Sequence, residues 1–504
     1  MPLVPIKDVG KVGIIRDTPP YQLPPNVWSN GNNVRFLDNG VKKCAGYEEV
    51  FATLPFAAYY IIPFLDNGGS YHWLAFGLNN AAVWDGSGWV DITRQKVGQL
   101  NGSLSASATS IVLDDSSFFP SSGTIAIGTN ETADSSINLY EEISYGANNT
   151  STNTLSSLTV ANAHPDNEIV TPVGTTATGD NLYSATATEN WRATILNGLL
   201  VATNGYDTAQ MWPLSSGVPN KTVPLRELKN WQSTSSFCKS ISSFRTFLVG
   251  LNWQIGGVEY PNLVKWSTEA AALSPPNSWV ESDATLDAGE YQLTDTPGKI
   301  IDGLPYGDSF LIYKEDSIYI MNFVGTPYIF SFKLLSPTIG LLTKNAVAEF
   351  SGGHFFVGNS DCYITNGQQV TALLPNKLRR EMFSDLNGDN YQKVFVVADH
   401  ARNEMLACYP AGVSTIPNKA IIWNWQDNTF SIRDIPDLYH INAGIAAITT
   451  GTTWEDHTEI WNDGAGIWGT GNYDNVLKSL VFAKPNEKAT ISGATAANPV
   501  VITS

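Results

Sequence analysis

The sequence repeats one pattern of short strands, and this repetition limits the folds that are open to it. Each copy has a strand, a turn with Gly, Asn or Asp, an apolar strand, a second turn and a third strand, and copies recur about every 40 to 50 residues. Six copies can be traced, in the segments 59–93, 191–214, 237–267, 298–323, 344–373 and 392–432.

Helical periodicity is almost missing from the sequence. The best amphipathic candidate is the short segment Leu373–Leu386, and charged residues make up only 15% of the chain, against about 25% in average proteins. One three-stranded unit cannot bury both faces of its sheet alone, whereas several stacked copies can. We therefore predict an all-β protein, a β-propeller of about six divergent blades. A large β-sandwich or a string of separate β-domains is the alternative.

One long stretch departs from the repeat. Residues 97–190 contain no Lys or Arg but ten acidic residues, and they are rich in Ser and Thr. Strand patterns persist there, for example in Ser110–Leu113 and Thr124–Ile127, which favours a folded unit over a disordered linker. We predict a small acidic β-domain inserted in a propeller loop. Its acidic residues are Asp114, Asp115, Glu131, Asp134, Glu141, Glu142, Asp166, Glu168, Asp180 and Glu189.

These patterns divide the chain into four predicted parts. A Trp-flanked hairpin is expected within Ile460–Lys484. The small polar residues that follow are expected to supply either a strand that closes the ring against the N-terminal part or an arm that packs on a neighbouring subunit. The parts are an N-terminal arm with the first strands (1–56), the propeller (57–96 and 191–440), the inserted domain (97–190), and a C-terminal hairpin and arm (441–504).

The chain is acidic, with a formal net charge of −18. This charge argues against tight binding of nucleic acid, which requires Lys and Arg to neutralise phosphates. The four cysteines lie far apart without a CxxC pair, so we expect free, mostly buried thiols. No apolar run is long enough for a signal sequence or a membrane span. We expect the chain to be made in a cytoplasm and to leave it, if at all, by another route.

No pattern for a metal or cofactor stands out. Asp385, Asn387 and Asp389 alternate as in a calcium loop, but Gly388 stands at the fourth position rather than the sixth, and Val396 replaces the bidentate Glu. A solvated turn is therefore expected there. The histidines have no HxH or HExxH spacing, and each is expected to be a surface or strand residue. They are His72, His164, His354, His400, His440 and His457.

No catalytic pattern stands out either. The segment Gly307–Phe310 (GDSF) is similar to the nucleophile block of some esterases, but it lies in a hairpin turn and not at a strand-to-helix elbow. Asp85–Trp89 matches a sialidase Asp box only distantly, and we interpret it as a tight hairpin turn. We assign no catalytic, cofactor-binding or metal-binding residue, and we expect that the protein is not an enzyme and needs no cofactor.

The most distinctive motif is Gln22–Gly46, QLPPNVWSNGNNVRFLDNGVKKCAG. It resembles the opening of virion proteins from short-tailed bacteriophages, in which such a stretch precedes divergent β-propeller blades. The insertion, through SATSIVLDDSSFFPSSGTIAIG, YEEISYGA, NTLSSLTV and AHPDNEIV, is similar to a small β-module that recurs in phage structural proteins. On both features the chain resembles the tail nozzle family, also described as tail tubular or tail-needle-proximal hub proteins.

This resemblance implies a structural virion protein of the tail, assembled in the cytoplasm of the bacterial host. Six subunits would form a ring, the distal tail tube, through which the genome leaves. The implied neighbours are a tail adaptor ring above and tail fibres or spikes at the side. Head-to-tail interfaces with cyclic symmetry make such a tube. Six copies of a −18 chain would carry −108 formal charges, so DNA would pass an acidic lumen without tight binding.

Ten of the 18 negative charges lie in 97–190, which leaves −8 for the other 410 residues. Repulsion of DNA is therefore strongest if the insertion faces the lumen, and weaker if it faces the tip or the exterior. A competing hypothesis is a virion-associated carbohydrate-binding propeller for host receptor recognition, with Trp84, Trp89, Trp253 and Trp266 stacking on sugars. Trp side chains that fill gaps between blades are the simpler interpretation, and a polysaccharide-degrading enzyme is a third hypothesis.

Overall fold

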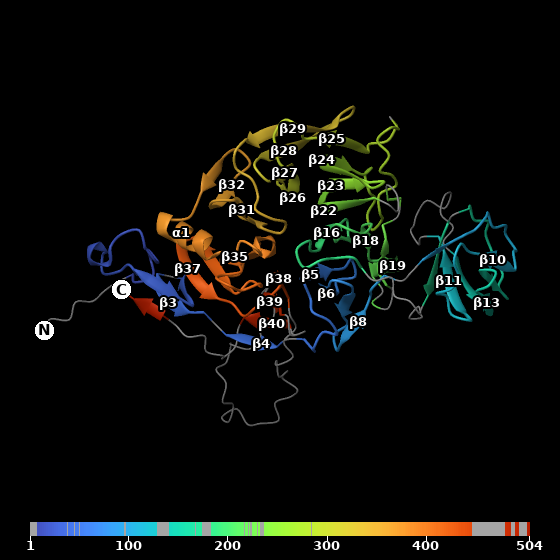
Figure 1. The fold of residues 1–504 in the computed structure, drawn as a ribbon, viewed down its shortest axis with the longest axis horizontal. Helices are drawn as coiled ribbons and strands as arrows, with labels where there is room; N and C mark the ends of the chain where they lie inside the picture. Colours follow the sequence, from blue (N-terminus) through green and yellow to red (C-terminus); the bar gives the residue numbers. More distant parts are fainter. Residues whose placement is uncertain are drawn as a thin grey trace, which may run out of the picture. The chain divides into compact units, whose positions relative to one another are not determined.

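The computed structural model consists almost entirely of strands (Figure 1). One α-helix, α1 (Asn376–Asp385), and two short 3-10 helices, η1 (Pro20–Gln22) and η2 (Tyr391–Lys393), lie among the described residues. The structure describes residues 8–37, 39–44, 46–49, 51–94, 97–128, 141–166, 168–173, 183–215, 217–219, 221, 224–228, 230–231, 236–283, 285–445, 479–484, 489–492 and 501–503.

Outside the insertion, the described residues form seven four-stranded sheets of the kind that makes propeller blades. The second strand is buried along its whole length in three of these sheets, in β17 (Leu199–Thr203), β31 (Gly353–Val357) and β35 (Glu404–Tyr409). In several of the sheets the last strand is half-buried or exposed, as in β8 (Trp89–Asp91) and β33 (Val370–Ala372). Because the inner strands are covered on both faces, their sequences are largely apolar and do not alternate.

Contacts within the chain define two compact units. The first comprises Met1–Pro63, Thr296–Val324 and Phe330–Ser504, and the second comprises Phe64–Asp295 and Gly325–Ile329. Three sheets associated with the first unit follow chain order. Their strands are β26 (Ile300–Tyr306), β27 (Ser309–Lys314), β28 (Ile318–Gly325) and β29 (Ile329–Ser336); β30 (Val347–Phe350), β31, β32 (Cys362–Thr365) and β33; and β34 (Phe395–Asp399), β35, β36 (Lys419–Asn424) and β37 (Thr429–Asp434).

A further sheet of the first unit is built from both ends of the chain. Its strand order is β38 (His440–Gly444), β39 (Ser479–Ala483), β40 (Ala489–Ser492) and β4 (Tyr47–Glu49). β4 pairs antiparallel with β40, and Figure 1 shows the two strands side by side. Residues near the C-terminus therefore supply a strand that pairs with the N-terminal part, which is one of the two roles predicted for them.

The N-terminal arm adds two small pairings. β1 (Asn30–Asn32) pairs antiparallel with β41 (Val501–Thr503), so both ends of the chain meet a second time. β2 (Val34–Leu37) and β3 (Gly40–Lys43) form a hairpin, and β2 contacts β37. The motif Gln22–Gly46 thus folds into strands that lie against the sheet β34–β37.

The second unit contains the other sheets of this plan, except for Tyr60–Pro63 at the start of their first strand, which belong to the first unit. Its largest buried side chains include Trp253 and Trp279, which pack with Trp231 at ring-centre distances of 4.8 Å to 5.5 Å. The strands are β5 (Tyr60–Leu65), β6 (Tyr71–Phe76), β7 (Ala81–Trp84) and β8; β16 (Arg192–Leu196), β17, β18 (Gln210–Met211) and β21 (Arg226–Glu227); β22 (Phe237–Phe244), β23 (Phe247–Ile255), β24 (Val258–Trp266) and β25 (Gly289–Gln292); and the short hairpin β19 (Leu214–Ser215) and β20 (Val218–Pro219).

The insertion has sheets and a core of its own. One cluster of buried apolar residues, which includes Phe118, Phe119 and Ile125, lies entirely within it. The predicted fold class, an all-β chain of the β-propeller type with a small inserted β-domain, is therefore confirmed. The insertion's strands are β12 (Glu141–Tyr145), β11 (Gly123–Ile127), β15 (Ile169–Val173) and β9 (Gly98–Gln99) in one sheet, and β10 (Ser110–Val112), β14 (Thr154–Ser156) and β13 (Ala147–Asn149) in the other.

Three details differ from the sequence prediction. The six traced segments correspond to six of the seven sheets, and the seventh is the sheet built from both chain ends. The predicted boundary at residue 440 falls inside β38, because that sheet needs strands from beyond it. α1 is shorter at both ends than the predicted helix and buries Leu378 and Met382. Most of the predicted hairpin Ile460–Lys484 lies outside the described residues.

The structure also shows the state of the cysteines. The four cysteines are free and buried, as predicted. In the part of the chain that the structure describes, no helix has both the length and the apolar character needed to cross a membrane.

Candidate functional site

One arginine joins both connections of the inserted domain to a neighbouring sheet of the second unit. Arg94, on the connection that leaves β8, donates through Nη2 to Asp207 Oδ1 at 2.9 Å, and its Nη1 lies 4.0 Å from Glu227 Oε1. Its main-chain N–H donates to the hydroxyl of Tyr183 at 3.2 Å, and its guanidinium lies 5.0 Å from the centre of that ring. Because Tyr183 is on the returning connection, Arg94 ties the two connections to the sheet that carries β21.

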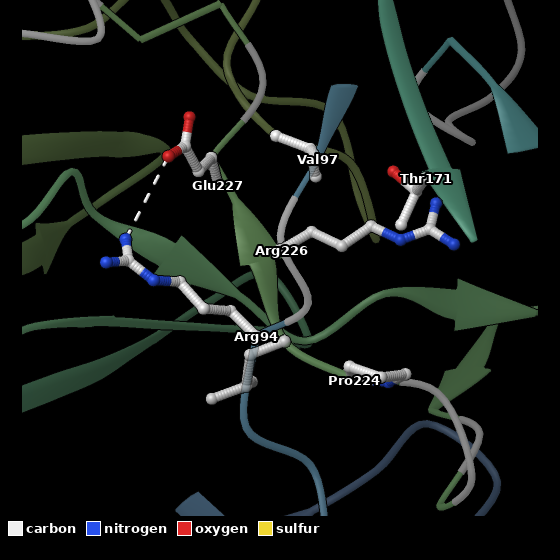
Figure 2. Close-up of a pocket in the computed structure, with 7 residues that line it drawn as sticks. Arg94, Val97, Thr171, Pro224, Arg226 and Glu227 are labelled. Carbon is white, nitrogen blue, oxygen red and sulfur yellow. Dashed lines mark ion pairs between the residues drawn. The ribbon is translucent and has the colours of Figure 1, made fainter. Parts of the chain in front are cut away.

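A pocket opens beside this junction, with an empty volume of about 290 Å³ that includes its open mouth. Figure 2 shows that the two guanidinium groups point apart: Arg94 reaches Glu227, whereas Arg226 extends toward Thr171 of β15. The structure thus brings a second arginine, Arg226, to the root of the insertion. The lining residues are Arg94, Val97, Thr171, Pro224, Leu225, Arg226 and Glu227.

Sequence reasoning did not identify Arg94 or Arg226. The available indication was the edge of the base-free stretch, since Arg94 and Lys96 are the last basic residues before residue 97. Nothing in the local sequence around Arg226 points to the pocket, because its neighbours there come from β15 and from the residues after β8.

The N-terminal motif forms the second functional candidate. Asn33 is fully buried, and its Oδ1 accepts a hydrogen bond from the main-chain N–H of Asp434 at 2.8 Å. Its Nδ2 donates to Asp434 Oδ2 at 3.0 Å, and its own N–H donates to the carbonyl of Ile432 at 2.8 Å. Asn33 therefore fastens the arm to the end of β37.

Arg35 supplies the charged part of the same attachment. Its Nη2 lies 3.4 Å from Glu404 Oε2, and both side chains are buried. Burial lowers the pKa of Arg35, but the negative charges of Glu404 and Asp399 together with Cys44 outweigh this effect and raise the pKa above its ordinary value. The removal of one member of such a pair leaves a buried charge without its partner and is strongly destabilising.

The strand histidines bond to the protein itself. His72 Nε2 lies 2.7 Å from Asp66 Oδ2, and the ring is buried in β6. His354, in β31, lies with Nδ1 at 2.9 Å from the hydroxyl of Tyr313 and with Nε2 at 2.9 Å from the carbonyl of Pro305. The prediction that the histidines are strand or surface residues is confirmed for these two, for His440 in β38 and for exposed His400, whereas His457 lies outside the described residues.

His164 is the single basic side chain of the insertion sequence. It is buried, with Nδ1 at 2.8 Å from Glu168 Oε2 and Nε2 at 3.3 Å from Glu141 Oε2. The two carboxylates occupy opposite sides of the ring, so they do not converge on one point. Among the residues that the structure describes, no group of three or more His, Cys, Asp or Glu side chains is arranged to hold a metal ion.

The two oxygen-rich motifs take part in ordinary structural contacts. Asp385 Oδ2 accepts a hydrogen bond from Lys419 Nζ at 2.6 Å, and Asn387 Nδ2 donates to a main-chain carbonyl. A lysine thus meets the carboxylate that a calcium ion would need. Ser309 lies in β27, as the hairpin prediction requires, and its Oγ donates to Asn322 Oδ1 at 2.6 Å.

The candidate sugar-stacking residues differ in exposure. Trp253 and Trp266 are buried, with 1% and 6% of their surface exposed, so their rings are not available to a ligand. Trp84 and Trp89 are half-buried and face each other across the β7–β8 hairpin, with ring centres 5.6 Å apart. Asp85 closes this hairpin by accepting main-chain N–H groups of the turn, as the interpretation of a tight turn predicts.

No family model and no curated protein matches the chain. Among solved structures, the computationally designed protein Ika8 is 8% identical, with a TM-score of 0.37 over 88% of this chain and 99% of that chain. Virginiamycin B lyase from Staphylococcus aureus is 10% identical, with a TM-score of 0.34 over 79% and 98%. AztD from Citrobacter koseri is 12% identical, with a TM-score of 0.32 over 77% and 86%. These likenesses carry no argument about what the chain does.

Proposed function

We propose that the chain is a structural virion protein that forms the distal tail tube, or nozzle, of a short-tailed bacteriophage as a homo-hexameric ring. The observation that carries the proposal is the motif Gln22–Gly46, which resembles the opening of that family. In this chain its residues Asn33 and Arg35 are buried in bonds that attach the arm to the sheet β34–β37. Here the motif residues attach one part of the chain to another, which is the kind of role expected in a structural protein.

The charge of the insertion supports a channel for DNA. Residues 97–190 carry no Lys or Arg, and Asp114, Glu142 and Asp166 are exposed there. DNA that meets such a surface finds no cation that can displace its counterions, so it is not retained. In the proposed tail, an adaptor ring lies above the hexamer, fibres or spikes lie at its side, and the genome passes through the lumen.

Native mass spectrometry of the purified chain tests the proposal. Six copies of a 54.7 kDa chain give a particle of about 330 kDa, and addition of an adaptor ring from a short-tailed phage is expected to give a larger discrete complex. In parallel, the chain is expected not to retain duplex DNA at low salt. A stable monomer or trimer that binds glycans, or tight binding of DNA, would overturn the proposal.

A carbohydrate-binding virion propeller is the second candidate, and the half-buried pair Trp84 and Trp89 favours it. Aromatic rings of this kind offer a flat apolar face to a sugar. A glycan array on the wild-type chain and on Trp84→Ala separates the two functions. Binding that disappears in the variant supports receptor recognition, whereas no binding by either protein leaves the tube as the proposal that stands.

A further inference from the structure

We propose that the pocket beside Arg226 binds a small monovalent anion of the size of chloride. Arg226 is 9% exposed, and its Nε is completely buried without a hydrogen-bond partner. Among the residues that the structure describes, no carboxylate forms an ion pair with this guanidinium. An arginine does not lose its proton in a protein, and a buried charge without a partner is costly. Only Nε, and neither Nη1 nor Nη2, is both buried and unpaired, so the ends of this guanidinium are the atoms that an anion from solution can reach.

The position of Arg226 on its strand explains why no acidic residue meets it. Arg226 and Glu227 are successive residues of β21, so their side chains leave opposite faces of the strand. The Glu227 carboxylate forms an ion pair with Arg94, and Arg94 forms a second ion pair with Asp207. Arg226 extends the other way, toward Thr171 of the insertion, as Figure 2 shows. Among the described residues, Glu227 and Asp207 both face Arg94, and no acidic side chain forms an ion pair with Arg226.

The remaining lining selects a small ligand. Val97, Pro224 and Leu225 make the wall largely apolar, and Thr171 contributes a hydroxyl group that can donate to an anion. The empty volume of about 290 Å³ includes open solvent, so the enclosed part is smaller than the roughly 300–1,000 Å³ of typical ligand pockets, which favours a small anion. Water fills such a space without supplying charge. Chloride is a small anion and supplies the negative charge that water lacks.

An anion at this site would strengthen the root of the insertion. Its contacts would join β21 of the second unit to Val97, where the chain enters the insertion, and to Thr171 on β15. Binding to the folded form alone raises stability in proportion to the logarithm of ligand concentration above the dissociation constant. The attachment of the insertion is therefore expected to depend on chloride itself, and not only on ionic strength.

Thermal unfolding of the full chain in sodium chloride and in sodium gluconate, at equal ionic strength, tests this proposal. We expect a higher unfolding midpoint in chloride for the wild type and loss of that difference in Arg226→Gln. Arg380→Gln is the matched control, because it removes the same charge from an exposed position on α1 and is expected to retain the difference. If both variants show the same difference between the unfolding midpoints in chloride and in gluconate, the effect of chloride does not depend on Arg226 and the proposal is overturned.

A second measurement holds even if Arg226→Gln does not fold. Crystals of the wild type grown in sodium bromide are expected to show an anomalous peak beside the Arg226 guanidinium. Thr171→Val, which keeps the shape of the side chain and removes its hydroxyl, is expected to weaken the dependence of the unfolding midpoint on chloride. A bromide map without a peak in this pocket, at a concentration where chloride raises the midpoint, would refute the site.

Discussion

Asn33 allows a direct test of how the N-terminal motif holds the arm. Its side chain makes two hydrogen bonds with Asp434, and its backbone is left-handed, with φ of +59°. Asn33→Gly removes both side-chain bonds and leaves the backbone unstrained. Asn33→Ala removes the same bonds and adds the strain that a Cβ brings to a left-handed residue. The two variants therefore separate the contribution of the bonds from that of the backbone.

The magnitudes follow from these contacts. Two hydrogen bonds, one of them to a carboxylate, contribute about 2 kcal/mol, and the left-handed conformation costs Ala about 1 kcal/mol more. Because 1.4 kcal/mol corresponds to a factor of about ten, Asn33→Gly should speed amide exchange in the arm about 30-fold, and Asn33→Ala about 5-fold further. Asn33→Asp keeps the acceptor, but it places a second carboxylate beside that of Asp434 and should also weaken the arm.

Hydrogen exchange read by mass spectrometry measures this opening, since local unfolding exposes a segment without unfolding the whole chain. Peptides from β2 and β3 report on the arm, and peptides from β23, in the second unit, serve as the internal control. Equal exchange in the Gly and Ala variants would refute the backbone contribution. Unchanged exchange in both variants would refute the claim that Asn33 fastens the arm.

Two further variants probe the other parts of the chain. A Cβ on Gly250 would lie 2.5 Å from Cζ2 of buried Trp253, so Gly250→Ala should lower the free energy of unfolding by about 1–3 kcal/mol. The unfolding midpoint read by near-ultraviolet circular dichroism should fall accordingly. Gly88→Ala is the control, because open space surrounds Gly88 and the midpoint should not change. Burial raises the pKa of Glu141, but hydrogen bonds from two main-chain N–H groups and from His164 outweigh it and hold the pKa below its ordinary value. The stabilising effect of Glu141 is thus complete above about pH 4.3 and is lost as pH falls through the lowered value, so acid titration of the insertion should show a loss of stability that Glu141→Gln reduces.

Most strands could be predicted because their pattern is local. The apolar run Phe310–Tyr313 lies within β27, and Met405–Tyr409 lies within β35. In both cases turn residues bound a run that is buried on both faces, and this pattern needs no knowledge of distant contacts. The composition shift at residue 97 identified the insertion for a similar reason, since it is visible without alignment to any other segment.

The seventh sheet could not be predicted in this way. β4, with the sequence Tyr-Glu-Glu, pairs with β40, and the two strands come from opposite ends of the chain. A polar three-residue strand has no apolar pattern of its own, so its place is decided by the unpaired edge that the partner strand offers. The bond between Asn33 and Asp434 spans 401 residues and depends on the same long-range arrangement.

Arg226 shows why a site of this kind is hidden in a sequence. The dipeptide Arg226–Glu227 has no net charge and would pass for a solvated pair on the surface. Once β21 forms, the alternation of the strand separates the two charges, and Glu227 faces Arg94, which lies 133 positions earlier in the chain. The fold also decides which residue of the insertion lies beside Arg226. That residue is Thr171, and not one of the insertion's acidic residues. An acidic chain can therefore leave one largely buried arginine without an ion pair among its described residues, and the proposed anion would complete the junction.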